Sequence, residues 1–464
     1  MSNVYPMKPS WRASLKSALL QAGLVVSLPF CSSSVANAAT LPNPLTLDYV
    51  LSLPLTEHPQ LSSQQALLDK LQAQRASQDA ADNFKLDLVG RLAWREYAEK
   101  DEDYHLAALH VQKSLYDFDR NQNLVDALGA KQQAQTILYA DAEQRMKLEI
   151  MQSFFNVLLA DFQYRIDNEA MAVAYVGLDK AKDRLELERI SDVEYLQMES
   201  EYERIMVKRT RSEYNQLQTR LTLANLLDLP KARPDELSFP KLENYSQRET
   251  EDLKLEVLQQ RVLDNNSRLT ALKQRMQGAQ LALQSQQAGN KPNLSLDAWA
   301  GKLSSYPEIR EGNWQVGLTL DIPLYDGGLT AAKVSEAKAE LEELKAQTRL
   351  LQQALRDEVA ELYFQIKMLQ AEKQQNLVFG DYADLYLDYS RALYENETAT
   401  DIGDSMVRLS EANYNQVAWQ FKQAMLWAKL DYLTGESRLT SSPSEAVSED
   451  TQPAVSKPKQ GNPS

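Results

Sequence analysis

The sequence predicts a mainly α-helical protein with a small membrane-type β part, built as two copies of one unit. Three observations support this fold class. No proline occurs between Pro59 and Pro230 or between Pro323 and Pro443, and both spans are rich in good helix formers. Four short stretches alternate apolar and polar residues, as strands with one apolar face do. Finally, several motifs recur at a constant distance along the chain.

The composition excludes some classes of protein. The chain has 464 residues, of which 25% are charged, and it has no run of about 18 apolar residues. We therefore expect no transmembrane helix. The formal net charge of −15 argues against nucleic acid as a partner, because binding to phosphates requires a basic surface.

The N-terminus is typical of a protein that is exported. Lys8, Arg12 and Lys16 precede a short apolar segment at 18–30, and residues 36–38 form a small-x-small cleavage motif. This pattern predicts a signal peptide over 1–38. Its removal would take the net charge from −15 to about −18 and would also remove Cys31, the one cysteine of the chain. An uncleaved anchor is the alternative, but about thirteen apolar residues are too few to span a bilayer comfortably.

The proline-free spans carry apolar residues at helical spacing. The steps alternate between three and four residues in Leu148, Met151, Phe155, Leu158 and Phe162. A second run of this kind lies at 355–366. A helix over about 121–182 would be roughly 90 Å long, which is typical of helical bundles and coiled coils rather than of compact domains.

The alternating stretches predict two hairpins, with strands at about 84–97 and 104–116 and at about 292–304 and 313–325. Strands of this length with one apolar and one polar face suit a tilted crossing of a bilayer around a wet interior. A hairpin packed on a soluble core is the alternative. In the membrane interpretation, the side chains expected to face lipid are Phe84, Leu86, Leu88, Val316, Leu318 and Leu320.

The chain is an internal duplication with an offset of 208 to 209 residues. For example, 57–61 recurs at 265–269, 115–117 at 324–326 and 154–157 at 363–366. Each half therefore contains a helix, a hairpin, a long helix, an Asp-containing turn and a further helix. Four strands are too few to close a membrane barrel, for which about eight are needed, and lipid does not tolerate open edges. The membrane interpretation thus requires several chains to share one barrel.

These residues resemble the TolC family of outer-membrane channel proteins over about 45–436. The resemblance rests on the exported N-terminus, on the duplication and on three motifs. These motifs are Leu55-x-x-His58-Pro59-x-Leu61, Ile322-Pro323-Leu324-Tyr325-Asp326-Gly327-Gly328 and Ile190-Ser191-Asp192-Val193. Three features depart from the family pattern. The stretch between Tyr394 and Asp401 is two residues shorter than the family's usual loop and contains Glu395 and Glu397 where a Gly is common. Residues 113–119 lack the Pro and the closing Gly of 322–328, and no Lys or Arg lies between Arg391 and Arg408 to match a basic gate residue.

The resemblance implies a homotrimer in the outer membrane of a Gram-negative bacterium. Four strands from each chain would form one 12-stranded barrel, and the long helices would continue it as a tunnel through the periplasm. The partners implied are a periplasmic adaptor protein, an inner-membrane pump and outer-membrane lipid. The implied domains are a signal peptide at 1–38, repeat 1 at 39–240, repeat 2 at 241–436 and a disordered tail at 437–464.

The sequence contains no catalytic constellation, so we expect a protein that is not an enzyme and needs no cofactor. The three histidines are His58, His105 and His110. His58 lies in a helix-turn motif. His105 and His110 are five residues apart on a predicted strand and hence on opposite faces, which does not favour a metal site.

The acidic turns are the candidate functional site. Asp192 follows Ser191, and Asp401 and Asp404 follow Thr400. Helix capping explains such residues without any further role. The resemblance instead places Asp192 and Tyr394 in contacts that close the tunnel. It places Asp401 and Asp404 as rings of carboxylates at its entrance, which would attract cations.

Two functions follow from these features. The first is a passive exit duct of a tripartite efflux or type I secretion system, carrying small molecules or proteins across the periplasm and outer membrane. The second is a soluble, adaptor-like periplasmic protein that acts by protein interaction only.

Overall fold

The computed structural model describes residues 41–92, 94–97, 100–103, 105–232, 234–248, 253–303, 312–396 and 402–436. The signal peptide predicted at 1–38 and the tail predicted at 437–464 lie outside these ranges, as does Asp401. No helix in the described ranges is long and apolar enough to cross a membrane.

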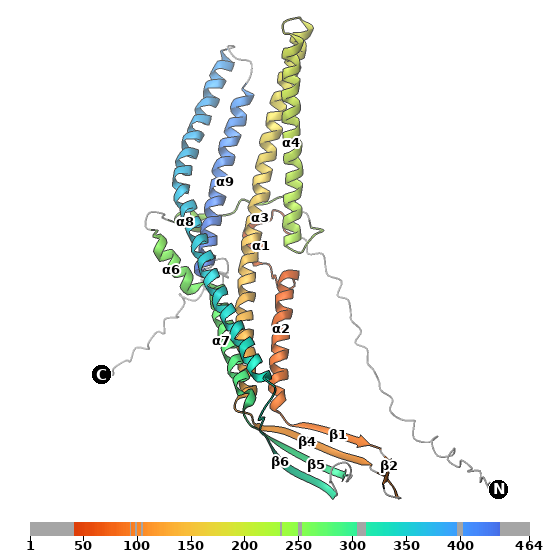
Figure 1. Cartoon of the computed structure of the whole chain (residues 1–464). Helices are drawn as coiled ribbons and strands as arrows, with labels where there is room; N and C mark the ends of the chain where they lie inside the picture. Colours follow the sequence, from red (N-terminus) through yellow and green to blue (C-terminus); the bar gives the residue numbers. More distant parts are fainter. Residues whose placement is uncertain are drawn as a thin grey trace, which may run out of the picture. The chain divides into compact units, whose positions relative to one another are not determined.

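The main elements repeat in the same order in the two halves, whereas β2 and β3 have no counterpart among the described residues of the second half (Figure 1). The first half contains α1 (Leu47–Ser52), α2 (Pro59–Asp79), η1 (Ala80–Asp82), β1 (Lys85–Arg91), β2 (Trp94–Tyr97), β3 (Lys100–Asp103), β4 (Leu106–Tyr116), α3 (Arg120–Glu186) and α4 (Asp192–Leu226). The second half contains α5 (Glu243–Ser246), α6 (Leu255–Asn265), α7 (Ser267–Gln287), η2 (Ala288–Asn290), β5 (Asn293–Leu303), β6 (Gly312–Asp321), α8 (Leu329–Glu395) and α9 (Gly403–Thr434).

The predicted duplication is visible in the lengths of the elements. The helices α2 and α7 both have 21 residues, and α3 and α8 both have 67. A straight helix of 67 residues is about 100 Å long. The sequence prediction of an unusually long helix over 121–182 is therefore confirmed, and α8 is its counterpart in the second half.

The strands form one antiparallel sheet in the order β1–β4–β5–β6. Each half supplies one hairpin, and the central pair β4–β5 joins the two halves. The strand β6 ends at Asp321 rather than near 325, because Pro323 has no N–H to donate to a ladder. The acidic stretch expected as a turn before 104 is instead β3, which pairs with β2 in a separate two-stranded ribbon. Its register pairs Tyr97 with Lys100.

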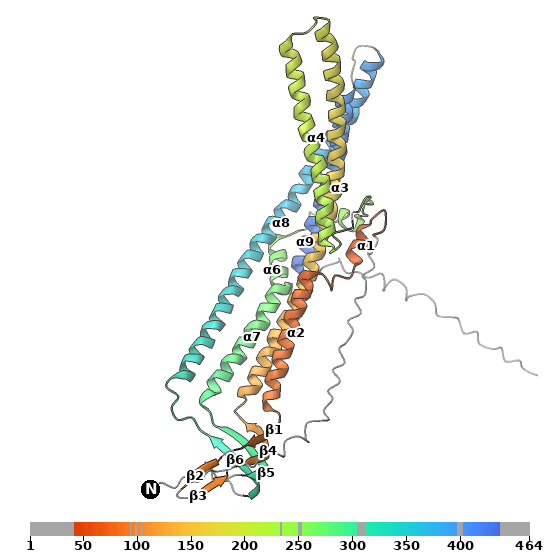
Figure 2. The same ribbon diagram turned by 90° about the vertical axis from the view of Figure 1, so that its right-hand side faces the viewer.

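The helices follow the order of the strands (Figures 1 and 2). Next to the sheet, neighbouring helices pack in the order α2–α3–α7–α8, which are the helices attached to β1, β4, β5 and β6. Further from the sheet the order is α4–α3–α9–α8, because α4 and α9 take the places of α2 and α7. From Pro42 onward, the described part of the chain therefore forms one layer that is four elements wide. Its three levels are the strands, the helices next to the sheet and the helices further from the sheet.

The core lies between helices from both halves. The predicted apolar run on α3 is buried from Leu148 to Leu158, with Phe154 and Phe155 fully enclosed. Phe155 stacks on Phe421 of α9 with 4.3 Å between ring centroids. The Tyr432 hydroxyl of α9 donates to Asp141 of α3 at 3.0 Å, and burial raises the pKa of Tyr432. The halves are thus joined by a common core.

The two strand-to-helix turns use the same hydrogen bonds but different residues. Asp117 accepts from the backbone N–H of Asn121, and Asp326 accepts from that of Thr330. The second turn then uses Gly327 and Gly328 at φ 68° and 89°, whereas the first places Phe118 and Asp119 at φ 60° and 61°. The missing glycine noted in the sequence is therefore replaced by residues held in the left-handed region.

Candidate functional site

One face of the four-stranded sheet is apolar and exposed. The register aligns Leu86, Val111, Ala298 and Val316 in one row across all four strands. The next row contains Leu88, Leu109, Ala300 and Trp314. Leu88 is 79% exposed and Leu318 is 66% exposed. The six side chains predicted to face lipid are all exposed, from 59% to 79%.

Two lysines interrupt the apolar face near its ends. Lys302 pairs with Ala107 near the far end of β5 from the helices. Lys113 pairs with Leu296 near the helical end of β4, and its ammonium lies 4.4 Å from the centroid of the Phe84 ring. Long side chains at such positions can cover apolar surface while the charge reaches water.

The opposite face of the sheet is polar. It carries Lys85, Asp87, His110, Gln112, Ser114, Asn293, Ser295, Asp297, Gln315, Thr319 and Asp321 by strand parity. Hydrogen bonds cross this face between the halves: Ser114 donates to Asn293 at 3.3 Å, and His110 pairs with Asp297 at 2.7 Å. A wet face backed by an apolar one is the arrangement that a strand in a water-filled membrane barrel requires.

The layer has open edges at every level. Among the described strands, β1 pairs only with β4 and β6 only with β5. The edge helices α4 and α8 each carry exposed apolar residues that are mostly three, four or seven positions apart, as in a coiled-coil seam, with one wider gap on each helix. On α4 these are Val193, Leu196, Val207, Tyr214, Leu217 and Leu221, and on α8 they are Phe364, Met368, Val378, Tyr382, Leu385 and Tyr389.

Asp192 lies at the first residue of α4, at the end of the α3–α4 hairpin. The capping expected of this turn is confirmed for its neighbour Ser191, whose side chain accepts from the Glu194 N–H at 3.2 Å. The Glu194 carboxylate in turn accepts from the Ser191 N–H at 2.8 Å, which lowers the pKa of Glu194. The side chain of Asp192 is exposed beside this capping box. Glu194 was not singled out from the sequence, although Ser-x-x-Glu is a known capping signature.

Asp404 lies in the first turn of α9, at the end of the other hairpin. Its carboxylate accepts from Arg408 Nε at 3.0 Å and from the Tyr386 hydroxyl of α8 at 3.3 Å. The hydrogen bond between Arg408 and the Asp404 carboxylate raises the pKa of Arg408. Arg408 therefore places a basic group beside Asp404 at this hairpin end. The i, i+4 spacing of Asp404 and Arg408 was the sequence signal for this pair.

Tyr394 is half-exposed near the end of α8. Within the described residues, no hydrogen bond joins Tyr394 to Asp192, so a closing contact between them stays a prediction. Asp401 lies outside the described residues, and the structure therefore brings only Asp404 of the two predicted entrance carboxylates into view.

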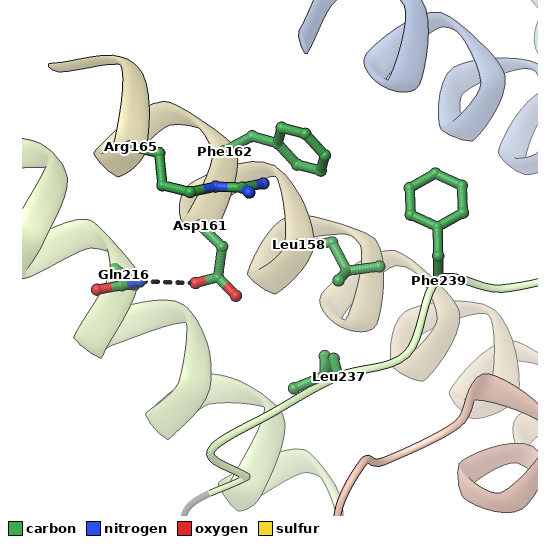
Figure 3. A pocket seen from close by; sticks show the side chains of 7 residues that line it. All are labelled: Leu158, Asp161, Phe162, Arg165, Gln216, Leu237 and Phe239. Carbon is green, nitrogen blue, oxygen red and sulfur yellow. Dashed lines mark hydrogen bonds between the residues drawn. The ribbon is translucent and has the colours of Figure 1, made fainter. Parts of the chain in front are cut away.

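A hollow lies between α3, α4 and the segment that carries Leu237 and Phe239 (Figure 3). Its volume is about 390 Å³. Asp161 on its wall accepts from Gln216 at 2.9 Å and binds Arg220 through both oxygens, at 2.6 and 2.9 Å. This carboxylate is fully engaged by its neighbours, so it is not arranged as a base or a nucleophile.

The histidines do not converge. The Nδ1 atom of His58 accepts from the Gln60 N–H and caps α2, as the helix-turn motif suggested. His110 lies on the polar face of the sheet, whereas His105 contacts the Trp94 ring edge-on. No group of three or more metal-binding side chains occurs among the described residues.

Part of the chain is similar to a known family. Residues 258–436 match the family model described as Outer membrane efflux protein. The matched segment runs from α6 to the end of α9, and the duplication relates repeat 1 to it. The predicted resemblance and the predicted location in the outer membrane are thereby confirmed.

Other known proteins agree with that match. Alkaline protease secretion protein AprF of Pseudomonas aeruginosa is 22% identical over 370 residues, which are 74% of this chain and 70% of AprF. The outer membrane protein VceC from Vibrio cholerae has a TM-score of 0.66 at 18% identity, over 84% of this chain and 96% of its own. The open state of the MtrE outer membrane channel from Neisseria gonorrhoeae has a TM-score of 0.64 at 16% identity, over 84% and 90%. The fold is therefore that of outer-membrane channels.

Proposed function

We propose that this protein is the exit duct of a tripartite efflux or type I secretion system. One observation carries the proposal: a four-stranded sheet with one apolar and one polar face is open at both edges and continues into helices about 100 Å long. The name of AprF refers to protein secretion and that of the family to efflux. Both are export across the outer membrane.

The open edges support a shared barrel. Because β1 and β6 lie at opposite edges, β6 of one copy can pair with β1 of the next, and the antiparallel alternation continues. Such a head-to-tail contact closes into a ring when the rotation between copies allows it. Three copies supply twelve strands, an even number above the minimum of about eight. We therefore propose a homotrimer.

The helical edges fit the same ring. The edge with β1 continues into α2 and α4, and the edge with β6 continues into α8. The exposed apolar stripes on α4 and α8 would then pack against each other between neighbouring copies, as coiled-coil seams do. This arrangement removes both stripes from water and makes a continuous tube.

The helical hairpins support the proposed partners and entrance. They project from the end of the molecule opposite the sheet (Figure 2), so they would reach into the periplasm toward an adaptor protein and an inner-membrane pump. Asp192, Tyr394, Asp401 and Asp404 are at or next to the hairpin ends and are proposed as the gate and entrance. Three copies would place each carboxylate in a ring, which favours cations.

Fractionation and conductance test this proposal. We expect the mature protein in the outer-membrane fraction as a heat-modifiable oligomer, and we expect the purified oligomer to form ion-conducting pores in planar lipid bilayers. Recovery only in the soluble periplasmic fraction, with no pores, would favour the adaptor-like alternative. The exposed apolar face of the sheet argues against that alternative, because exposed patches of this kind on soluble proteins mark contact or aggregation sites.

A further inference from the structure

The two repeats correspond residue by residue. The first strand of each hairpin begins at Lys85 or at Asn293, an offset of 208 residues, and α2 and α7 have the same offset. The helices α3 and α8 begin 209 residues apart. The hairpins also share one register, because Lys85 pairs with Gln112 and the corresponding Asn293 pairs with Asp321. The offset is therefore 208 up to the first strand of the hairpin and 209 from its second strand onward.

This correspondence relates the seam between the repeats to the open edges of the sheet. At the seam, Val111 on β4 pairs with Ala298 on β5. The offset of 209 relates Val111 to Leu320 on β6, and the offset of 208 relates Ala298 to Gly90 on β1. The strands β6 and β1 are the two edges of the sheet (Figure 1). The internal seam is thus a template for a contact between β6 of one copy and β1 of the next.

The two faces of the sheet provide an independent check on this template. Leu320 shares the apolar face of β6 with Leu318, and Gly90 has the parity of Leu88 on the apolar face of β1. The template therefore joins apolar face to apolar face and polar face to polar face between copies. A register shifted by one residue would instead place apolar side chains of β6 beside polar side chains of β1.

The helices next to the sheet carry the same relation. Inside the chain, the buried Ser285 of α7 donates from its hydroxyl to the Arg120 carbonyl of α3 at 2.8 Å. The residue that corresponds to Ser285 on the edge helix α2 is Ser77, which is exposed. The carbonyl that corresponds to that of Arg120 belongs to Leu329, at the start of α8 on the opposite edge. The same serine thus lies where a neighbouring copy offers the equivalent acceptor.

A second pair of helical positions is complementary in charge. A Cβ added to Gly278 of α7 would lie 2.9 Å from the Ala127 carbonyl oxygen of α3, so the two helices approach closely at the internal seam. The corresponding residues at the edges are Lys70 on α2 and Glu336 on α8, and both are exposed. Opposite charges at these positions favour the approach of one edge to the other rather than of two identical edges.

We propose that the contact between neighbouring copies repeats the internal seam, with Leu320 on β6 directly opposite Gly90 of the partner subunit. The inference rests on the proposed function, in which copies share one barrel, and it adds the register of that barrel. Because the two edges differ, each copy binds the next head to tail. Directly opposite residues have Cβ atoms about 4.5–5.5 Å apart and diagonal neighbours about 7–8 Å apart, so the register can be measured.

Disulfide crosslinking of cysteine pairs tests the register. Cys31, the one cysteine of the chain, lies in the predicted signal peptide, so crosslinks of the mature protein would come from introduced cysteines. Gly90→Cys with Leu320→Cys should give a covalent oligomer after oxidation of outer-membrane fractions, measured on denaturing gels without reductant. A Cβ at Gly90 meets open space, so this cysteine needs no rearrangement within its own chain.

The matched controls shift the register by two residues and stay on the apolar face. In Leu88→Cys with Leu320→Cys and in Leu92→Cys with Leu320→Cys, the two cysteines would be diagonal neighbours. A disulfide requires Cβ atoms about 3.5–4.5 Å apart, so both controls should crosslink severalfold less than the pair with Gly90→Cys. Gly90→Cys alone and Leu320→Cys alone should give no covalent oligomer. Heat-modifiable oligomer before oxidation shows that each variant has assembled.

Three outcomes would overturn the inference. Stronger crosslinking in either control pair would show that the register between copies differs from that of the internal seam. An assembled oligomer without crosslinks in any of the pairs would show that β1 and β6 do not pair between copies. A wild-type protein that is monomeric and forms no pores would reject the proposed function and this inference with it, and that result is recognised before any cysteine is introduced.

Discussion

Repeat 1 and repeat 2 have the same order of main elements, but the helices α4 and α9 begin differently in the two repeats. Both contain a 21-residue helix, a hairpin and a 67-residue helix. At the hairpin end of repeat 1, a local capping box formed by Ser191 and Glu194 begins α4. In repeat 2 the residue before α9 is Ile402, which has no side-chain cap, and Asp404 is held instead by Arg408 and by Tyr386 from the neighbouring helix.

This difference indicates a division of roles. The start of α4 is stabilised within its own first turn, whereas the start of α9 depends on contacts that link it to α8. A contact between helices changes whenever the helices move relative to each other, but a capping box does not. A movement between α8 and α9 would therefore disturb the start of α9 but not the capping box at the start of α4.

The sheet is the region where the repeats should behave alike, and it carries the largest expected effect. Leu318 on β6 corresponds to Leu109 on β4 at the offset of 209 residues. Arg at either position, if near the middle of the bilayer, should cost about 2–4 kcal/mol and impair insertion, whereas Thr319→Arg on the polar face should be tolerated. Heat-modifiable oligomer in outer-membrane fractions measures insertion. Equal tolerance of Leu318→Arg and Thr319→Arg would contradict the assignment of the lipid face.

The unfolding free energy should change in opposite directions when glycine is removed from one strand-to-helix turn and introduced into the other. Gly328 at φ 89° has open space where a Cβ would lie, so Gly328→Ala is opposed only by the backbone conformation. We expect a loss of about 1–2 kcal/mol of unfolding free energy, measured by urea denaturation in detergent. Asp119→Gly in repeat 1 should be neutral or stabilising by up to about 1 kcal/mol, because glycine adopts the left-handed region without strain. Destabilisation by Asp119→Gly would show that the Asp119 side chain is needed at this turn.

The capping box should contribute to stability only in repeat 1. Ser191→Ala should cost about 1 kcal/mol, and Thr400→Ala serves as the control in repeat 2, where Ile402 rather than Thr400 precedes α9. Because hydrogen bonds from Ser191 lower the pKa of Glu194, this contribution is present above the ordinary pKa of glutamate and is lost as the pH falls. In Glu194→Gln, the part of the unfolding free energy that is lost at acid pH through this cap should disappear. An identical acid dependence of unfolding with and without Glu194 would contradict this interpretation of the cap.

Substitution of the charged residues proposed at the entrance should change ion selectivity rather than stability. Asp401→Ala with Asp404→Ala should reduce cation selectivity and weaken block by multivalent cations. Because Arg408 partly neutralises Asp404, Arg408→Gln should increase cation selectivity. Unchanged selectivity in both variants would mean that these carboxylates do not line the entrance.

A further prediction concerns the proposed gate. A hydrogen bond between Tyr394 and Asp192 would contribute about 0.5–1.5 kcal/mol, or about 1.5–3 kcal/mol with a charged carboxylate, and would be repeated in each copy. Tyr394→Phe with Asp192→Ala should therefore raise single-channel conductance by favouring an open entrance. If conductance is unchanged, closure must depend on other residues, among which the Asp404–Arg408–Tyr386 contact is the first to examine.

The sequence predicted the periodic features well. Long proline-free spans indicated α3 and α8, and strict alternation indicated the two faces of the sheet, because period and proline placement act directly on local backbone geometry. The duplication placed the halves in register. The ribbon formed by β2 and β3 was missed, because the acidic residues there have no apolar alternation to distinguish a strand from a turn.

Tertiary contacts were harder to predict. The positive φ of Phe118 and Asp119 was not foreseen, because the sequence indicated only that a glycine was absent. The pairing of His110 with Asp297 joins residues 187 positions apart, and its geometry depends on the order β4–β5 in the sheet. The role of Tyr386 at Asp404 depends on how α8 and α9 pack, which no local pattern specifies.

The central claim is that this open-edged layer is completed by further copies of the same chain. The most direct measurement is the mass of the purified, mature protein in detergent, by light scattering or native mass spectrometry, together with its strand content by circular dichroism. We expect a mass of three chains and a strand content that is lost only when the oligomer dissociates. A stable monomer that keeps its full strand content would contradict the claim.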